Sequence, residues 1–208
     1  MSLVLPAVLD LTQVAPAFDD PTRESQAVFR KVMDAVARPG TIQDLVFAPD
    51  TPAGLDRAAG AVALTLFDFE TPVWLDPALR GSAAEGWMRF HCGCPLTDQP
   101  QDAAFALVTD IGAAPALAEF NPGDAKYPDR STTVVIQLPA LEGGPAITLT
   151  GPGVKTEASL APTGLPPGFW EQVQVNNGRF QFGVDLLFVA GDRLAALPRS
   201  TRITIKGV

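Results

Sequence analysis

The chain has 208 residues and a formal net charge of −8, so it lacks the basic face with which proteins bind nucleic acid or anionic membranes. Hydrophobic residues make up 47% of the chain and charged residues only 18%, against a usual charged share of about 25%. We therefore expect part of the apolar excess to lie in an interface between chains.

The sequence indicates one cytoplasmic domain over residues 1–208. A domain of this length buries enough surface to fold without disulfides or metals. No apolar run reaches the length of about 18 residues that a membrane span needs, and the N-terminal residues are not typical of a secretory signal. The two cysteines lie one residue apart, which is poor spacing for a structural disulfide and favours a reducing compartment.

The first predicted elements are an arm and a helix. Residues 1–21 predict an irregular arm whose apolar side chains pack on the rest of the protein. A helix is expected to begin near Asp20–Thr22, where Asp20 can cap it and Pro21 can take the first turn. Its predicted buried face comprises Val28, Phe29, Val32, Met33 and Val36. The sequence Arg38-Pro39-Gly40 should end it, because the residue before a proline avoids the α region.

Strand and helix patterns alternate from there to residue 130. Strands are predicted at Thr41–Phe47, at Thr71–Leu75 and within Gln101–Val108. Helices are predicted at Ala53–Leu66 and Ala113–Phe120, with a brief helix or loop at Ala83–Arg89 and a polar loop at Asn121–Arg130.

From Ser131 onward, β patterns dominate. Thr132–Leu138 and Ile147–Thr150, joined by a Glu-Gly-Gly-Pro turn, predict a hairpin. Val184–Ala190 is almost entirely apolar, which predicts a central strand covered on both faces. The remaining elements are a helix at Phe169–Asn177 and strands at Leu194–Pro198 and Thr201–Ile205. The whole pattern favours an α/β fold, a mixed sheet with helices on both sides.

The side chains best suited to metal binding by soft ligands, or to proton transfer near neutral pH, are histidine and cysteine. The single histidine and both cysteines of the chain lie in one stretch, Arg89–Leu96 (RFHCGCPL). His91 suits proton transfer because its unperturbed pKa lies near neutrality, although a lone histidine after a phenylalanine is more often a hydrogen-bonded core group. Cys92 and Cys94 have no second histidine to activate them. The His-Cys-x-Cys spacing is too tight for the usual zinc sites, so we expect no metal.

Arginines near turns form the second group of candidates: Arg38, Arg89, Arg130, Arg199 and Arg202. A guanidinium group matches the geometry of carboxylate and phosphate, but most of these arginines are expected to be solvated or paired. Asp185 lies beside the predicted central strand, where a carboxylate needs a partner, and its structural role would be to pair with an arginine. The sequence has no phosphate-binding loop, dinucleotide fingerprint or nucleophile elbow.

Five stretches, taken together, resemble a known family. They are Phe29–Thr41 (FRKVMDAVARPGT), Thr71–Leu75 (TPVWL), Arg89–Leu96, Thr148–Gly153 (TLTGPG) with the preceding LEGGP turn, and Gly183–Ile203. Their order and spacing across nearly the whole chain resemble the PhnH component of the bacterial carbon–phosphorus lyase system. Two positions depart from that pattern. Gln181 stands where the family often has proline, and Cys92 stands where it often has threonine or another small residue, which disfavours a shared thiol mechanism.

The resemblance implies a three-layer α/β/α fold with a mixed sheet, similar to that of pyridoxal-phosphate-dependent transferases but without a cofactor. No lysine of the chain is a convincing Schiff-base residue. The resemblance also implies a homodimer that joins the G, I and J components in a core complex. That complex converts alkylphosphonates, with ATP, into ribose-linked phosphonates. The J component, an iron–sulfur protein, then breaks the carbon–phosphorus bond.

Two functions stay open. The chain can be a dimeric assembly subunit that is not catalytic alone, which the apolar composition and the missing nucleotide loop favour. Alternatively it is a ligand-binding or catalytic subunit, with a phosphonate or a nucleotide phosphate held in a pocket lined by Arg38, Arg89, His91 and Arg199.

Overall fold

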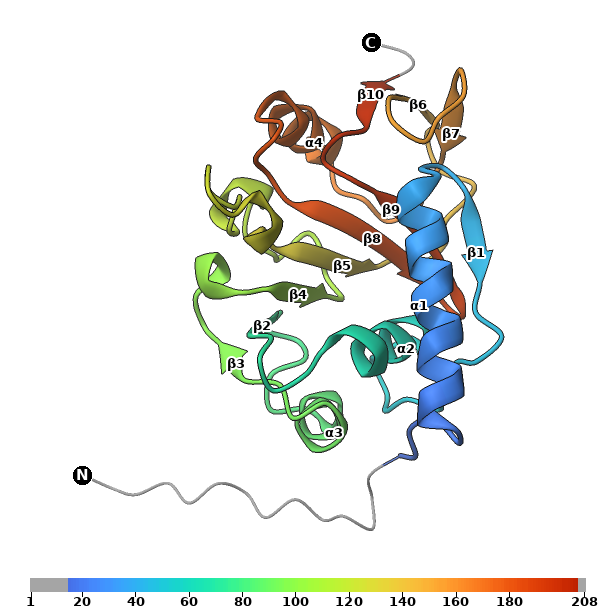
Figure 1. Ribbon diagram of the computed structural model, residues 1–208, viewed down its shortest axis with the longest axis vertical. Helices are drawn as coiled ribbons and strands as arrows, with labels where there is room; N and C mark the ends of the chain where they lie inside the picture. Colours follow the sequence, from blue (N-terminus) through green and yellow to red (C-terminus); the bar gives the residue numbers. More distant parts are fainter. Residues whose placement is uncertain (1–14, 206–208) are drawn as a thin grey trace, which may run out of the picture.

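A computed structural model describes residues 15–205, so most of the predicted N-terminal arm lies outside the described residues. Over this range the centre of the molecule is a seven-stranded sheet in the order β1-β9-β8-β5-β4-β2-β3 (Figure 1). Its strands are β1 Ile42–Asp44, β2 Val73–Leu75, β3 Leu96–Thr97, β4 Phe105–Val108, β5 Thr133–Gln137, β8 Asp185–Ala190 and β9 Arg193–Leu197. A three-stranded sheet, in the order β10-β6-β7, comprises β6 Ile147–Thr150, β7 Ala158–Leu160 and β10 Arg202–Ile205.

The large sheet is mixed, as predicted. Strands β3, β2, β4, β5 and β8 are parallel to one another, whereas β9 is antiparallel to both β8 and β1. We call the side of the sheet where the five parallel strands finish its carboxyl end, and the opposite side its amino end. Strand β8 is buried along nearly its whole length and pairs on both sides, which confirms the central strand expected from Val184–Ala190.

Three helices cover one face of the large sheet: α1 Pro21–Ala37, α2 Arg57–Leu66 and α3 Ala83–His91. Helix α1 begins as predicted, because the Asp20 side chain accepts a hydrogen bond of 3.1 Å from the Arg23 N–H. The predicted buried face is wrong for Phe29 and Met33, whose exposed fractions are 46% and 49%. The apolar stripe that packs on the sheet follows Val28, Val32 and Ala35, and a residue one position further along a helix lies about 100° round from that stripe.

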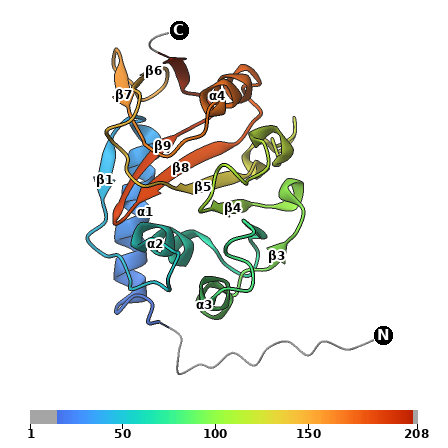
Figure 2. The ribbon, with the colours of Figure 1, turned by 180° about the vertical axis from the view of Figure 1, so that it is seen from behind.

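The opposite face is covered by α4 Phe169–Gly178, the 3-10 helix η3 Leu117–Glu119 and the small sheet. Side chains that alternate along the strands divide between the two layers. Val135 and Leu187 face the α1–α3 layer, whereas Val134 and Phe188 face α4 and the small sheet. The sheet is therefore covered on both faces, and the small sheet joins α4 in the second layer. Both ribbon views place α4 and the small sheet at the end of the molecule opposite α3 and β3 (Figures 1 and 2).

The predicted hairpin of Thr132–Leu138 and Ile147–Thr150 is wrong. Strand β5 pairs with β4 on one side and β8 on the other, so neither of its sides is left for β6. Strand β6 instead pairs with β10 and β7 in the small sheet. Turn chemistry correctly indicates that the chain bends between β5 and β6, but it carries no information about long-range partners.

Several predicted elements are shorter in the structure than in the sequence pattern. Strand β1 covers three residues of Thr41–Phe47, and α2 begins at Arg57 rather than at Ala53. The helix predicted at Ala113–Phe120 is reduced to η3, because Pro115 keeps the residue before it out of the α region. Two further 3-10 helices are η2 Pro100–Asp102 and η4 Pro128–Arg130. Within residues 15–205 no helix is long and apolar enough to cross a membrane.

Candidate functional site

The predicted site residues Arg89 and Arg199 lie at opposite ends of the large sheet. Arg199 is paired with Asp185, the first residue of β8. Arg89 lines a cavity with Leu75, the last residue of β2. Since β2 and β8 run in the same direction, the first residue of one and the last residue of the other belong to different ends. The structure therefore does not bring these two arginines into one pocket.

Arg199 is held by acceptors of the protein itself. Its backbone N–H donates to Asp185 Oδ1 at 2.8 Å. Its Nη1 donates to Asp185 Oδ2 at 3.2 Å and to the Gly183 carbonyl at 3.1 Å, and it also contacts the Ser131 hydroxyl. Nη2 donates to the Pro128 carbonyl at 2.9 Å. These bonds tie the chain before β5 to the start of β8, and they confirm that Asp185 pairs with an arginine.

Arg38 ends helix α1, and its contacts are local. Its backbone N–H donates to the Asp34 carbonyl at 3.1 Å, and its guanidinium pairs with the Asp34 carboxylate one turn earlier. The Arg38 side chain is 59% exposed, so the ion pair is screened by solvent and contributes little to stability. Arg38 does not belong to the lining of the cavity that contains Arg89.

His91, in the last turn of α3, is bonded to the N-terminal part of the described chain. Its Nε2 lies 3.0 Å from the carbonyl oxygen of Ala15, and a carbonyl only accepts, so Nε2 carries the proton. Trp87 Nε1 donates to the same oxygen at 2.9 Å. The imidazole also packs edge-on against the rings of Trp87 and Phe90. His91 is thus placed to anchor the chain at Ala15, and it does not line the Arg89 cavity.

The two thiols are poorly suited to nucleophilic chemistry at neutral pH. Burial and, to a smaller extent, the neighbouring Cys94 together raise the pKa of Cys92 to about 12. Burial also raises the pKa of Cys94 above its ordinary value. Because the thiolate is both the nucleophile and the metal ligand, both cysteines stay in the unreactive form. Across residues 15–205 no group of three or more histidine, cysteine, aspartate or glutamate side chains could hold a metal ion.

The cavity that contains Arg89 lies at the carboxyl ends of β2 and β3 and has a volume of about 180 Å³. Its lining comprises Leu75, Arg80, Glu85, Arg89, Leu96, Thr97 and Asp98. Glu85 Oε1 accepts from Arg89 Nε at 2.9 Å, and Asp98 is paired with Arg80. Two arginines and two carboxylates thus meet around one small space, and this cavity is the candidate site.

Sequence reasoning missed Arg80 and the buried aspartate that shapes its loop. Asp76 directly follows β2 and is fully buried. Its Oδ1 accepts from the N–H of Leu79 at 3.1 Å, and its Oδ2 accepts from the Thr109 hydroxyl at 2.8 Å and the Asp110 N–H at 2.9 Å. Asp76 thereby joins the ends of β2 and β4 and fixes the loop that carries Arg80. The available signal was an aspartate placed immediately after a buried strand.

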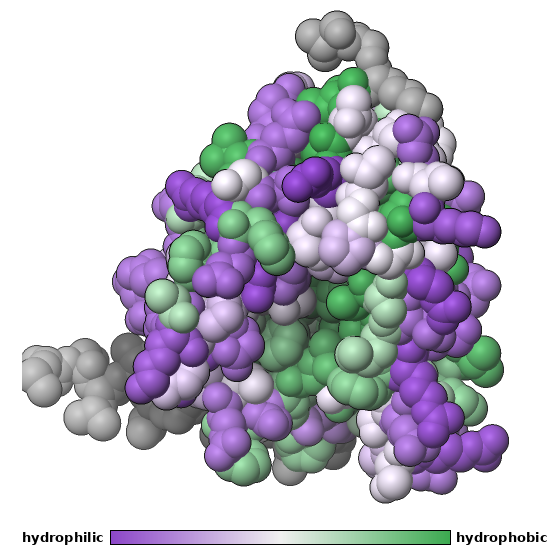
Figure 3. All heavy atoms as spheres, turned by 45° about the horizontal axis from the view of Figure 1, so that its top comes forward, coloured by the Kyte–Doolittle hydropathy of each residue, from purple (hydrophilic) through white to green (hydrophobic). Residues whose placement is uncertain are grey.

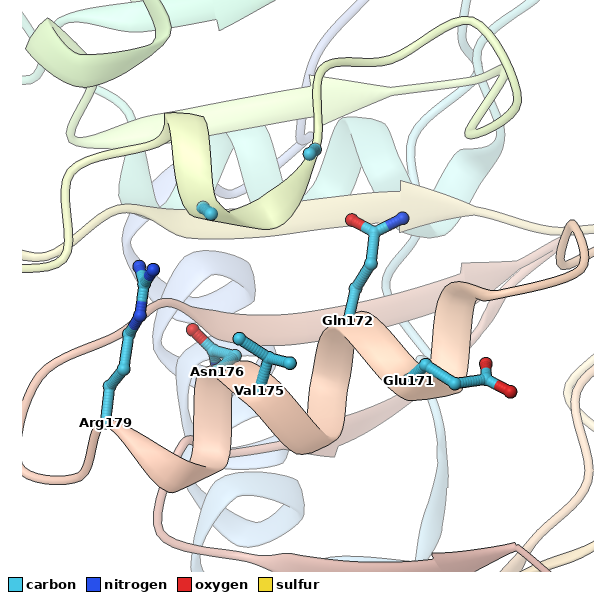
Figure 4. A pocket seen from close by; sticks show the side chains of 7 residues that line it. Glu171, Gln172, Val175, Asn176 and Arg179 are labelled. Atoms are coloured by element: carbon cyan, nitrogen blue, oxygen red, sulfur yellow. The ribbon is translucent and has the colours of Figure 1, made fainter.

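A second cavity, of about 240 Å³, lies between η3 and α4 (Figure 4). Gln172, Val175, Asn176 and Arg179 point from α4 toward η3, whereas Glu171 points aside. Two of these polar groups are already bonded, since Gln172 accepts from the Leu117 N–H at 3.0 Å and Asn176 bonds to the backbone of Val184. Arg179 also borders an adjoining hollow of about 390 Å³. This region offers apolar surface rather than a set of reactive groups.

Comparisons with known proteins agree with one another. Residues 16–204 match the model of a family described as bacterial phosphonate metabolism protein (PhnH). The chain is 46% identical over 187 residues to alpha-D-ribose 1-methylphosphonate 5-triphosphate synthase subunit PhnH of Rhizobium meliloti (strain 1021), covering 90% of this chain and 94% of that protein. It is 32% identical over 186 residues to a putative C-P lyase subunit protein, HtxG, of Stutzerimonas stutzeri, covering 88% and 87% of the two chains.

Proposed function

This chain belongs to the PhnH family of bacterial phosphonate metabolism proteins, and from that membership we propose that it is an assembly subunit of a carbon–phosphorus lyase core complex. Both similar proteins carry the word subunit in their names, which implies partner chains. Our proposal includes a homodimer, contacts with the G, I and J components, and a fold related to that of pyridoxal-phosphate-dependent transferases. Helices on both faces of a mixed sheet are compatible with that fold.

The observation that carries the assembly role is apolar side chains exposed in two separate places. The α1 surface comprises Phe29 and Met33 on α1, with exposed fractions of 46% and 49%. On the flank of α1 that faces β1, Val46 is 82% exposed and borders a cavity of about 130 Å³ between α1 and the segment after β1. Strand β1 is also the edge of the large sheet, and edge strands left open to solvent tend to pair with other chains.

The α4 surface lies on the other face of the large sheet. It comprises Val175 and Phe180, with exposed fractions of 58% and 65%, and the two hollows that Arg179 borders. Apolar surface is not confined to these residues, since Figure 3 shows apolar side chains gathered in a hollow near the middle of the face in view, among polar ones. Two separate apolar surfaces are what a subunit needs to contact its own copy and a different partner at the same time.

Catalysis by this chain alone is disfavoured, because its candidate reactive side chains are already hydrogen-bonded within the protein or are held protonated. His91 is bonded to a backbone carbonyl, Arg199 is occupied by protein acceptors, and the thiols are held protonated by burial. We infer that the chemical steps belong to partner subunits and that this chain supports their assembly.

The test is co-expression with the G, I and J components, followed by affinity purification and light scattering. The double variants Phe29→Asp/Met33→Asp and Val175→Asp/Phe180→Asp should each abolish one contact, either with the second copy or with the partners. Phe69→Asp is the matched control, since Phe69 is 77% exposed but belongs to neither surface. A wild-type chain that is monomeric at micromolar concentration and purifies without partners would overturn the proposal, and so would two double variants that assemble normally.

The alternative function, an anion pocket built from Arg38, Arg89, His91 and Arg199, keeps only one of its four residues in the candidate cavity. The observation that still favours ligand binding is that Arg89 meets a second arginine there, Arg80.

A further inference from the structure

We propose that the cavity at the carboxyl ends of β2 and β3 binds a small tetrahedral oxyanion between the guanidinium groups of Arg80 and Arg89. This Arg80–Arg89 site is a property of the chain's own residues. It stands independently of the assembly role, because none of its lining residues contributes to the α1 or α4 surface.

Arg89 is fixed in a way that leaves its terminal nitrogens available. Glu85, one turn earlier on α3, accepts from Arg89 Nε at 2.9 Å. The other Glu85 oxygen accepts from the Gly81 N–H at 2.7 Å, and the Glu85 side chain is only 18% exposed. Among the described residues Nη1 and Nη2 of Arg89 have no hydrogen-bond partner. An arginine held at Nε by a fixed carboxylate presents the terminal fork that oxyanions bind.

Arg80 is fixed from a different direction. Its Nε donates to the carbonyl of Leu75 at 3.0 Å, and its Cζ lies 5.7 Å from the centre of the Trp74 ring. Its Nη1 is paired with Asp98, whose side chain is 82% exposed. Solvent-exposed pairs of this kind are weak, so an incoming anion can displace the Asp98 carboxylate and bind Arg80 in its place.

The location of the site agrees with the architecture of α/β proteins. Open sheets of this class bind ligands outside the carboxyl ends of their parallel strands, near the point where the connections diverge to opposite faces. The site meets the first of these conditions, because it lies at the carboxyl ends of β2 and β3, within the β2–α3–β3 connection. The point where the connections diverge is one strand away, between β2, whose connection passes through α3 on one face, and β4, whose connection passes through η3 on the other. Asp76 accepts from the N–H of Leu79, the residue before Arg80, so the loop is anchored before any ligand arrives.

The size and lining of the site define the class of ligand. A volume of about 180 Å³ is below the range of roughly 300–1,000 Å³ typical of pockets for larger ligands, so the cavity is too small to enclose a nucleotide and suits a small anion. Donors from two arginines suit an anion with oxygens on several sides. Leu75 and Leu96 add a small apolar wall that can accept a substituent of methyl size. Inorganic phosphate and a short alkylphosphonate share this chemistry.

The experiment is isothermal titration of the purified full chain with inorganic phosphate and, separately, with methylphosphonate, each at constant ionic strength. Arg89→Gln and Arg80→Gln should each weaken binding by about tenfold or more, since each removes a charge-assisted hydrogen bond. Asp98→Asn should tighten binding by about threefold, because it removes the competing carboxylate. The matched control is Arg193→Gln, which removes an arginine paired with Glu142 at 2.9 Å outside the site and should bind like the wild type.

The gain in anion affinity expected for Asp98→Asn separates ligand binding from a purely structural role. If these residues only stabilised the fold, the loss of an ion pair would not increase the affinity for an anion. Saturable binding of phosphate, of methylphosphonate or of both supports the site and identifies the anion that it prefers. The proposal fails if neither anion gives saturable heat up to about 10 mM, if Arg89→Gln binds like the wild type, or if Asp98→Asn binds more weakly. Arg89→Gln should still assemble with partner subunits, so failure of this site and failure of the assembly role are distinguishable.

Discussion

The two ends of the large sheet both carry an arginine paired with a carboxylate, and they differ in how many arginine donors the protein uses. At the amino end, Arg199 bonds through Nη1 and Nη2 to Asp185 and to backbone carbonyls, and its side chain is 16% exposed. At the carboxyl end, Arg89 bonds to Glu85 through Nε, and its side chain is 57% exposed.

This difference indicates which arginine stabilises the fold and which can serve a ligand. A guanidinium group surrounded by protein acceptors loses its hydrogen bonds when the protein unfolds, so it contributes to stability. A guanidinium group with unused donors contributes little to folding but can bind an anion from solution. We therefore expect the amino end to respond to substitution mainly through stability and the carboxyl end mainly through binding.

The largest expected effect is at the amino end. Arg199→Met should lower the free energy of unfolding by about 3 kcal/mol, because it leaves Asp185 and two carbonyls without their donor. Urea denaturation followed by circular dichroism measures the loss. Arg199→Lys keeps the charge but not the fork, so it should recover less than half of the lost stability. A loss below about 1 kcal/mol in Arg199→Met would contradict the structural assignment of this end.

The second prediction concerns Asp76, a buried carboxylate at the carboxyl end whose two oxygens both accept hydrogen bonds from the protein. It tests whether a group with no unused bonding capacity affects stability at this end of the sheet as Arg199 does at the other. Asp76→Asn should cost about 2 kcal/mol, since an amide nitrogen would replace one oxygen and face backbone N–H donors. In a chain of this size that corresponds to a fall in Tm of about 4–8 °C in a thermal melt. Asp110→Asn is the control, because the Asp110 carboxylate is exposed and bonds only to the nearby Gly112 N–H. Equal melting of Asp76→Asn and wild type would show that Asp76 does not hold the Arg80 loop.

The third prediction concerns His91, which lies on α3 beside Arg89 but has a structural contact. His91→Phe keeps the aromatic packing and removes the bond to the Ala15 carbonyl, so it should cost about 1 kcal/mol. Backbone amides near Ala15 should also exchange faster with deuterium, because Trp87 alone would hold that carbonyl. An unchanged exchange pattern, together with lost activity of the assembled complex, would instead assign His91 a catalytic role.

The sequence predicted those parts of the fold that depend on local pattern. The Asp20 cap and the apolar stripe predicted the position of α1, and the almost entirely apolar run Val184–Ala190 predicted that β8 is central. The partner of β5 could not be predicted, because its pairing with β4 and β8 depends on residues far away in the sequence. Phe29 and Met33 were misplaced because a stripe of apolar residues on a helix can be wider than the face that is buried.

The candidate site was only partly predictable for a similar reason. The sequence singled out Arg89 and Arg199 by residue type and by position near turns, but it could not say which donors their neighbours would occupy. Arg80 was missed because its role depends on the loop that Asp76 fixes and on the position of α3 relative to β3. Side-chain type indicates which chemistry is available, whereas the number of unused donors is a property of the folded structure.

The smallest expected effect on stability is in two matched ion pairs, each within one helix. Arg89→Gln in α3 and Arg38→Gln in α1 should each change the free energy of unfolding by less than about 0.5 kcal/mol, because both arginines are mostly exposed and pair one turn away. Denaturation of the two variants in parallel measures this, and only Arg89→Gln should also lose phosphate binding. If Arg89→Gln cost as much stability as Arg199→Met, the two ends of the sheet would not differ in the way that we infer. Arg89 would then have to bond to protein acceptors through more than its Nε.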